Sequence, residues 1–417
     1  MTDTKIEVKN LYKIFGKRPD DVLQRVRKGV SKQEILKRTG HTVGLDDVSL
    51  DVRAGETFVV MGLSGSGKST LVRCLNRLIE PTSGEIVVDG VDIVQLGRKE
   101  MQALRREKMG MVFQHFALLP HRNVIDNVAY GLKLQGMGRE ERYERARTWI
   151  EVVGLKGYEK ARPTALSGGM QQRVGLARAL ATDPEILLMD EAFSALDPLI
   201  RREMQDELIR LQRELHKTIV FITHDLDEAL RLGDRVAILN AGRVVQVGTP
   251  EQILTEPADD YVEAFVQNVD RSRVLSARLA METGLRARVD ATPTSLLTDL
   301  ANDEWKTAFV TDGNGRYKGV VGIEEVRKGA RRGDADLRKL LSESAPTVRY
   351  DSPLSEMFSV GAASSVPIAV LGDNDVLEGI LTHRAVLAAL SSESDRVAHM
   401  ESAEANRHTA ETTSPKR

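Results

Sequence analysis

A glycine-rich segment with one lysine has the residue types needed to bind a polyphosphate. It reads Gly62-Leu63-Ser64-Gly65-Ser66-Gly67-Lys68-Ser69-Thr70 and lies between an apolar run, 57–61, and a helix-forming stretch, 68–79. Glycines let successive backbone N–H groups turn towards phosphate oxygens, and a helix start adds its positive dipole end. Lys68 supplies a charge for the outer phosphates, and Ser69 offers the hard oxygen that Mg²⁺ prefers. The order of strand, loop and helix matches the phosphate-loop pattern, so a chance glycine-rich turn is the weaker interpretation.

Two adjacent carboxylates end another apolar run and could complete such a site. The run Ile186-Leu187-Leu188-Met189 is followed at once by Asp190 and Glu191. An apolar run of this kind is typical of a central strand covered on both faces. Asp190 is expected to orient Mg²⁺, and Glu191 to polarise a water that attacks a phosphate, because phosphoryl transfer needs mainly positioning and charge stabilisation. Acids are common at strand ends, so this pair alone is only suggestive.

The elements that must position these groups alternate between strand and helix patterns. From about Lys5 to Val269 the alternation predicts an α/β sheet. Helix-forming segments such as 139–153 dominate between about residues 115 and 165, which predicts a helical subdomain inserted into the α/β core. We therefore expect one domain over residues 1–270.

A basic stretch at 17–41 interrupts the first strand patterns. It holds eight Lys or Arg residues against three acids, and Ser31 with Glu34 forms a capping-box pattern that predicts a short helix. We interpret it as an insertion. Contact with a membrane surface or partner subunits and a plain solvated helix are equally compatible with its charge pattern.

The pattern of turns changes after Asp270. Asp/Asn/Gly turns at 312–315 and 372–374 each follow an apolar run, which predicts two hairpins and a weak tandem repeat over 279–390. From residue 391 to 417 large apolar side chains are almost absent, so this tail is predicted to be disordered.

Composition excludes several classes of function. The 417 residues carry 59 Lys and Arg against 61 Asp and Glu, a net charge of −2 that offers no global field for nucleic acid. No apolar run approaches the roughly 20 residues that span a bilayer, and the polar N-terminus lacks a secretory signal, so we expect a cytoplasmic protein. Cys74 is the single cysteine, which excludes an internal disulfide and favours a buried apolar role.

A further motif makes the assignment specific. The segment Leu166-Ser167-Gly168-Gly169-Met170-Gln171-Gln172-Arg173 opens a helical run and resembles the signature motif of ABC ATPases. Ser167, Gly168 and Gly169 would form a second anion-binding helix start, for which an ordinary serine N-cap is the alternative. The resemblance covers about the first 270 residues and implies a P-loop NTPase fold that binds ATP and Mg²⁺.

The resemblance also implies roles for residues that would be unremarkable alone. Gln114 matches the Gln-loop residue that touches both Mg²⁺ and the membrane partner, and Asp197 lies in a segment similar to the D-loop at the dimer interface. His224 matches the switch histidine that contacts the γ-phosphate, and Phe15 the aromatic that stacks on adenine. In the family, the phosphate loop of one subunit and the signature of the other enclose each ATP, which implies a homodimer.

One branch of the family is more similar still, the ATPases of glycine betaine/proline betaine importers. The basic insertion, the block 189–201 and the C-terminal extension carry this resemblance. It implies membrane permease subunits, an extracytoplasmic substrate-binding protein, and a peripheral location at the cytoplasmic face of the membrane. Alternatives are the ATPase of another amine or amino-acid importer, an exporter ATPase, and a non-transport ABC ATPase acting on nucleic acid. The last is disfavoured by a single cassette, near-neutral charge and the lack of sustained heptads.

Residues 279–390 resemble a tandem pair of cystathionine-β-synthase (CBS) modules, with the clearer copy around 345–382. Two positions depart from the family pattern: Ala385 stands where an acidic residue is expected, and Gly322 where the first copy should have a threonine. Because those positions usually hold a ribose, the departures disfavour nucleotide binding. Dimerisation or sensing of ionic strength is the preferred role, and an inert dimer clamp is the alternative.

Overall fold

The computed structural model describes residues 3–114, 116–194, 196–267, 269–342, 345–361, 364 and 366–391. The chain divides into two units, Met1–Val269 and Asp270–Arg417. The tail predicted to be disordered, 391–417, lies outside the described residues except for Ser391, as do His115 and Ala195 of the predicted motif segments.

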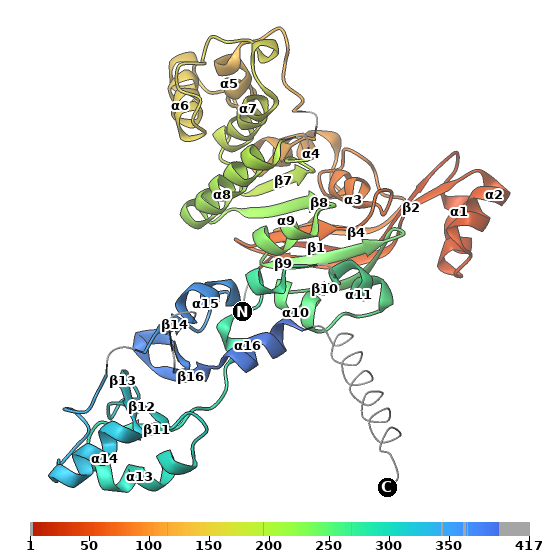
Figure 1. The fold of residues 1–417 in the computed structure, drawn as a ribbon. Helices are drawn as coiled ribbons and strands as arrows, with labels where there is room; N and C mark the ends of the chain where they lie inside the picture. The colour runs from red at the N-terminus through yellow and green to blue at the C-terminus, as the bar shows by residue number, and fades with distance from the viewer. Residues whose placement is uncertain are drawn as a thin grey trace, which may run out of the picture. The chain divides into compact units, whose positions relative to one another are not determined.

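The first unit is built on a six-stranded sheet in the order β10-β9-β3-β8-β7-β6 (Figure 1). Its strands are β10 (Arg243–Gly248), β9 (Arg235–Asn240), β3 (Thr57–Met61), β8 (Thr218–Thr223), β7 (Ile186–Asp190) and β6 (Met109–Val112). Neighbouring strands are parallel except for β10, which pairs antiparallel with β9 at one edge. Every residue of β3, β7 and β8 is buried, so the predicted central strand at 186–189 is confirmed, and it extends to Asp190.

A second, antiparallel sheet covers this core in the order β2-β1-β4-β5 and was not predicted. Its strands are β1 (Thr4–Phe15), β2 (Thr42–Arg53), β4 (Ser83–Val88) and β5 (Val91–Asp92). Ile6 and Val8 of β1 alternate with less buried residues and pack in one hydrophobic core with Val60 of β3 and Leu71. The sheet is therefore held by burial of one face, which is the period-two pattern of a half-exposed strand.

Helices pack around the two sheets. They are α3 (Lys68–Leu75), α4 (Arg98–Glu107), α8 (Pro198–Leu215), α9 (Leu226–Leu232), α10 (Pro250–Thr255) and α11 (Asp260–Val266). The prediction that the first of these reaches residue 79 was wrong: α3 ends at Leu75, and Arg77 takes a left-handed φ of 50°. The Arg77 guanidinium there donates to the carbonyls of Ile93 and Leu96, both at 2.7 Å, which favours leaving the helix.

Cys74 of α3 confirms the predicted buried role. It is 0% exposed within the core shared by the two sheets. Burial raises the pKa of its thiol to about 12, because the thiolate would lose its hydration there.

A helical cluster separates β6 from β7 in the sequence. It consists of α5 (Val124–Leu134), α6 (Arg139–Val152) and α7 (Gly168–Ala181), which stand above the six-stranded sheet in Figure 1. The cluster has its own apolar core, with Val128, Ile150 and Val174 all 0% exposed. Because α7 belongs to it, the helical part reaches past residue 165. A 3-10 turn, Pro163–Ala165, precedes α7.

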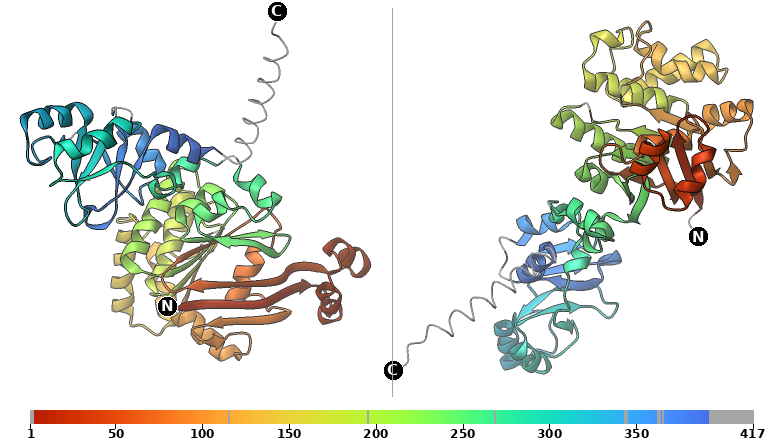
Figure 2. Two further views of the ribbon diagram at one scale, coloured as in Figure 1. Left: turned by 90° about the horizontal axis from the view of Figure 1, so that it is seen from below. Right: turned by 90° about the vertical axis from the view of Figure 1, so that its right-hand side faces the viewer.

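The basic insertion forms two helices rather than one, α1 (Asp20–Arg27) and α2 (Lys32–Thr39). They lie at the end of the long β1–β2 ribbon, as the left view of Figure 2 shows. The serine half of the predicted capping box is confirmed, because Ser31 Oγ accepts a hydrogen bond from the Glu34 N–H at 3.2 Å. Val22, Val26 and Ile35 form a small core with Ile14 of β1, so the helices are packed.

The second unit repeats one arrangement twice. The first copy holds β11 (Arg286–Arg288), α13 (Pro293–Asn302), β12 (Thr307–Thr311), β13 (Tyr317–Gly322) and α14 (Ile323–Arg332). The second holds β14 (Thr347–Arg349), α15 (Leu354–Gly361), β15 (Ile368–Leu371), β16 (Leu377–Leu381) and α16 (His383–Leu390). Short helical turns lie at Arg271–Arg273, Ala277–Ala280 (α12) and Asp373–Asp375. Each copy forms a three-stranded sheet with one parallel and one antiparallel pair, and the two predicted hairpins are the antiparallel pairs.

None of the helices in the described ranges combines the length and apolar character needed to cross a membrane.

Candidate functional site

The carboxyl ends of the parallel strands meet at one edge of the six-stranded sheet, and most of the predicted site residues follow directly from them. The phosphate loop, residues 62–70, follows β3; Gln114 follows β6; Glu191 follows β7; and His224 follows β8. Parallel strands bring their carboxyl ends to the same side of a sheet, which is where α/β proteins bind ligands. Topology alone therefore gathers groups that are far apart in the sequence.

The phosphate loop needs glycine where its backbone presses against other strands. Gly62 and Gly67 have φ of 150° and 106°. A Cβ on Gly62 would lie 2.2 Å from the carbonyl oxygen of Leu239, and one on Gly67 would lie 2.7 Å from that of Gly44. The loop is also held from behind, because the Gly242 N–H donates to the Ser66 carbonyl at 2.7 Å. Close backbone contacts with neighbouring segments therefore help to fix the loop.

The hydroxyl of Ser66 turns into this loop. The residue is 4% exposed, and its Oγ has no hydrogen-bond partner within the described ranges. A buried hydroxyl without a partner costs stability, so its presence marks a place where a ligand could supply the missing bond. Ser64 and Gly65 complete the exposed turn of the loop, where Gly65 has a φ of 80° and open space around it.

Lys68 lies across the loop and is 4% exposed. Its Nζ donates to the carbonyls of Gly62, at 2.8 Å, and Leu63, at 3.1 Å. Burial lowers the pKa of the ammonium, and the charges of Glu191 and Asp190 oppose that shift. The lysine is therefore a pre-positioned cation whose main-chain partners can give way to phosphate oxygens.

Ser69 and Asp190 present oxygens to each other. Ser69 Oγ donates to Asp190 Oδ1 at 2.8 Å, and the guanidinium of Arg73 lies 3.4 Å from the other carboxylate oxygen. Asp190 is 3% exposed, so its charge is held by a hydroxyl and a cation rather than by water. Arg73 was not predicted; its place one turn after Ser69 on α3 was a usable signal.

Glu191 is the point at which the predicted catalytic residues meet. Its Oε2 accepts a hydrogen bond from Gln114 Nε2 at 2.9 Å and lies 3.6 Å from His224 Nδ1. Its Oε1 lies 3.9 Å from Lys68 Nζ. The backbone of Glu191 is left-handed, with a φ of 47°, and its N–H donates to the Ile222 carbonyl at 3.1 Å. A non-glycine residue in this conformation is strained by roughly 1–2 kcal/mol and keeps it only where the surrounding contacts hold it.

Phe15, the predicted adenine-stacking residue, lies beside the helical end of the phosphate loop. A Cβ on Gly44 would lie 2.8 Å from the Phe15 ring and 3.4 Å from the Thr70 methyl group, so these two side chains approach the same point. The ring is 38% exposed, and Lys13 Nζ lies 5.0 Å from its centre. The ring thus has a face open to a planar ligand.

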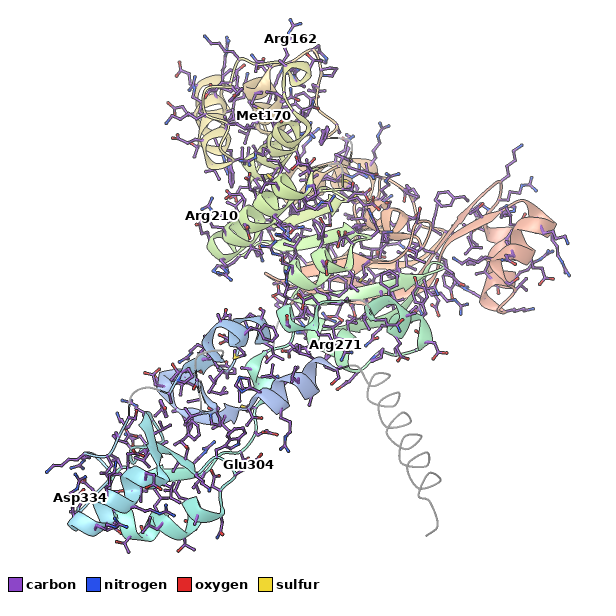
Figure 3. The ribbon with its side chains drawn as sticks, viewed as in Figure 1. Arg162, Met170, Arg210, Arg271, Glu304 and Asp334 are labelled. Atoms are coloured by element: carbon purple, nitrogen blue, oxygen red, sulfur yellow. The ribbon has the colours of Figure 1, made fainter. Side chains whose placement is uncertain are left out.

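The signature residues and Asp197 lie apart from this group. Ser167 Oγ caps α7 by accepting from the Met170 N–H at 3.3 Å, and Figure 3 shows Met170 within the helical cluster. Gly168 and Gly169 form the first turn of α7. Asp197 caps α8 through the Ile200 N–H at 3.1 Å. In the part of the chain that is described, no hydrogen bond or ion pair joins them to Lys68 or Glu191.

Arg178 of α7 holds the chain just beyond Gln114 and was missed by sequence reasoning. Its guanidinium donates to the carbonyls of Ala117, at 2.7 Å, and Phe116, at 3.1 Å. Both of those residues have left-handed φ values, 47° and 57°. Burial lowers the pKa of Arg178. An arginine within the apolar stretch 174–181 of this helix was the available signal, since such a cation needs buried acceptors.

Comparison with known proteins gives the context of this site. A family model described as "ABC transporter" matches residues 45–194. A glycine betaine transport ATP-binding protein of Bacillus subtilis (strain 168) is 48% identical over 393 residues, which cover 94% of each chain. A glycine betaine/proline betaine transport system ATP-binding protein of Escherichia coli (strain K12) is also 48% identical over 393 residues, covering 93% of this chain and 98% of the relative.

A solved dimeric structure of a bacterial ABC transporter cassette is 33% identical, with a TM-score of 0.51. It covers 59% of this chain and 98% of the cassette. The same cassette, in a dimeric post-hydrolysis state bound to ADP and Pi, matches with the same values.

Gly67→Ala tests whether the phosphate loop is set by close backbone contact. We expect at least a 10-fold loss of affinity for an ATP analogue, because a Cβ 2.7 Å from the Gly44 carbonyl must displace the loop. Binding is measured by titration with a fluorescent analogue. Gly90→Ala is the matched control: its φ is 77°, but nothing lies within 4 Å of the added Cβ. Equal losses in both variants would show that general destabilisation by a left-handed alanine, and not contact with Gly44, lowers the affinity.

Proposed function

This chain belongs to the family of ATP-binding subunits of ABC transporters, and we propose that it drives import of glycine betaine and related quaternary amines. It is an ATP-hydrolysing transporter subunit, as its family match and its 48% identical relatives establish. The observation that carries the chemistry is the convergence of Lys68, Gln114 and His224 on the carboxylate of Glu191.

The proposed reaction uses groups that are already aligned. The loop's N–H groups and Lys68 would bind the phosphates of ATP, with phosphate oxygens replacing the Gly62 and Leu63 carbonyls on the ammonium. Glu191 would accept a hydrogen bond from the attacking water and so orient it, while Gln114 keeps the carboxylate in place and His224, beside the carboxylate, contacts the γ-phosphate. Phe15 would stack on the adenine ring, which requires only an open aromatic face.

We assign Mg²⁺ binding to oxygens of Ser69, Asp190 and Gln114. The fit is supported by the 2.8 Å hydrogen bond between Ser69 and Asp190, which brings two hard oxygens to one place. Among the described residues no group of three or more His, Cys, Asp or Glu could hold a metal alone, so nucleotide phosphates would complete the ligand set. When bound, the ion would neutralise charge on the phosphates.

A homodimer would complete the site. Ser167, Gly168 and Gly169 form an exposed, capped helix start of the kind that binds anions, and Asp197 is exposed at the start of α8. Among the described residues of one chain, no hydrogen bond or ion pair joins these groups to the phosphate loop, so we propose that a second copy presents them to the ATP. The dimeric state of the similar cassette supports this arrangement.

We propose that the other partners are membrane permease subunits and, through them, an extracytoplasmic substrate-binding protein. The names of the relatives, which are subunits of transport systems, support such an assembly. The chain would then sit at the cytoplasmic face of the membrane as a peripheral subunit. The packed α1–α2 insertion could contact lipid or a partner there, and its eight basic residues suit either role.

For residues 279–390 we propose a CBS-like regulatory region that responds to ionic strength or mediates dimerisation. The twofold repeat of sheet and helices supports the tandem assignment. Thr382 Oγ1 donates to Glu282 at 3.0 Å and accepts from the Ala385 N–H at 3.0 Å. Because this hydroxyl is engaged and a carboxylate lies beside it, the site is poorly suited to an anionic nucleotide.

Glu191→Gln tests the hydrolytic role. We expect ATP turnover to fall by about 100-fold or more, because the amide cannot accept the proton of the attacking water, while ATP binding persists. Steady-state phosphate release and equilibrium ATP binding are measured on the same preparation. Glu214→Gln, at an exposed position on α8, is the control and should retain full turnover. Normal turnover in Glu191→Gln would refute the proposed mechanism.

Transport by the complete complex tests the proposed solute. Vesicles containing this chain with its permease and binding protein should take up radiolabelled glycine betaine when ATP is supplied inside. Lys68→Ala should abolish uptake, because the phosphates lose their cation. Competition by unlabelled proline betaine, choline or carnitine ranks the alternatives. A lack of glycine betaine uptake under osmotic upshift would reject this solute.

Removal of residues 270–417 tests the regulatory role of the second unit. If that unit senses ionic strength, the truncated complex should transport glycine betaine with a flat response to internal salt. The control removes only residues 392–417. Salt-dependent transport that is unchanged after the full truncation would leave the region without a sensory role.

A further inference from the structure

Arg201 links the turn at Asp197 to the segment that holds His224. It lies on the first turns of α8, four residues after Asp197, and its side chain is 29% exposed. One guanidinium nitrogen, Nη2, donates to the Leu196 carbonyl at 3.1 Å, within the Asp197 turn. The other, Nη1, lies 3.4 Å from the carboxylate of Asp225, which follows His224 directly. A single planar group thus contacts both segments.

The two residues that flank His224, Thr223 and Asp225, are held by hydrogen bonds to each other and to Glu228. Thr223 Oγ1 accepts the Asp225 N–H at 2.9 Å and donates to the carboxylate of Glu228 at 2.6 Å. Asp225 in turn caps α9 by accepting the Glu228 N–H at 3.2 Å. The backbone on either side of His224 is therefore held by a closed set of hydrogen bonds, while the imidazole itself is 56% exposed and free to face a ligand.

Glu228 ties this set back to α8. It is 5% exposed, and it accepts a hydrogen bond from Gln205 Nε2 at 3.0 Å. Its Oε1 lies 3.8 Å from Arg201 Nε. Burial raises the pKa of Glu228, while the Thr223 hydroxyl and the Arg201 charge oppose the shift. A buried carboxylate needs its few hydrogen-bond and charge partners in fixed positions. Movement of Arg201 should therefore shift Glu228 and, through it, Thr223.

We propose that Arg201 is a positioning residue that couples the position of His224 to that of the Asp197 turn. The inference rests on the proposed role of His224 at the γ-phosphate and adds the route by which a partner subunit at Asp197 would set it. Loss of the Arg201 guanidinium would leave His224 present but displaced from its position in the site. Because Arg201 touches no residue of the phosphate loop in the described part of the chain, ATP binding is not affected.

The test measures ATP turnover in a set of variants of the full-length protein. Arg201→Gln should lower kcat by about 10-fold and change KM for ATP by less than 2-fold, since transition-state placement is lost and ground-state binding is kept. Arg201→Lys, which keeps the charge without the fork, should fall between wild type and Arg201→Gln. Arg202→Gln is the matched control, because its side chain is the exposed neighbour on the same helix.

A double substitution separates positioning from general stability. If Arg201 acts through His224, adding Arg201→Gln to His224→Ala should lower the residual single-turnover rate by less than 2-fold. An equal 10-fold drop in both backgrounds, or a rise in KM with kcat unchanged, would overturn the inference alone. Wild-type turnover in His224→Ala would overturn the role of His224 and this inference with it.

Thr223→Val keeps the proposal testable if Arg201→Gln fails to fold. It removes the hydroxyl that joins Glu228 to the His224 segment and preserves the shape of the side chain. We expect the same loss of kcat and the same lack of further loss in the His224→Ala background. Full turnover in Thr223→Val, with folding confirmed by thermal melting, would show that the Glu228 link does not position His224.

Discussion

The carboxylate of Glu191 is shared by side chains that arrive from three other places in the fold, and the arrangement of the site depends on that sharing. Gln114 comes from the end of β6, His224 from the end of β8, and Lys68 from the loop after β3. Each strand end is fixed by a parallel sheet whose central strands are wholly buried. A shift of one strand by a single residue would exchange its two faces and remove its contribution. Burial of the central strands therefore determines where the polar side chains of the site lie.

The arrangement strains the backbone at Glu191, and hydrogen bonds of the neighbouring backbone offset that strain. Glu191 adopts a left-handed conformation that costs roughly 1–2 kcal/mol, and its N–H is bound by Ile222 of the neighbouring strand. The phosphate loop is likewise pressed against the carbonyls of Gly44 and Leu239, so its glycines are required by contact as well as by dihedral angle. After Gln114, the left-handed residues Phe116 and Ala117 are likewise held by hydrogen bonds that their carbonyls accept from Arg178. Left-handed backbone therefore occurs beside the candidate site, at Phe116, Ala117 and Glu191, as well as in turns elsewhere in the chain.

Local spacing made part of this predictable from the sequence. The phosphate loop, the Asp190–Glu191 pair and the strand before it are short patterns whose chemistry and context lie within about ten residues. The antiparallel sheet was missed because the insertion at 17–41 separates β1 from β2 in the sequence and hides their pairing. The contacts of Arg178 and Arg201 were missed because each partner lies elsewhere in the sequence and only packing joins them. The predicted end of α3 was wrong because the Arg77 guanidinium donates hydrogen bonds to carbonyls of Ile93 and Leu96, which come later in the sequence.

The burial of Cys74 has a practical consequence. The chain carries one thiol, and the core between the two sheets encloses it completely. The native molecule therefore resembles a cysteine-free background for spectroscopy. A cysteine introduced at an exposed position such as Leu199, beside the Asp197 turn, would be the preferred point of attachment for a fluorophore or spin label. In the proposed homodimer, distances between labels on the two copies could then be followed during ATP hydrolysis without first replacing a native cysteine.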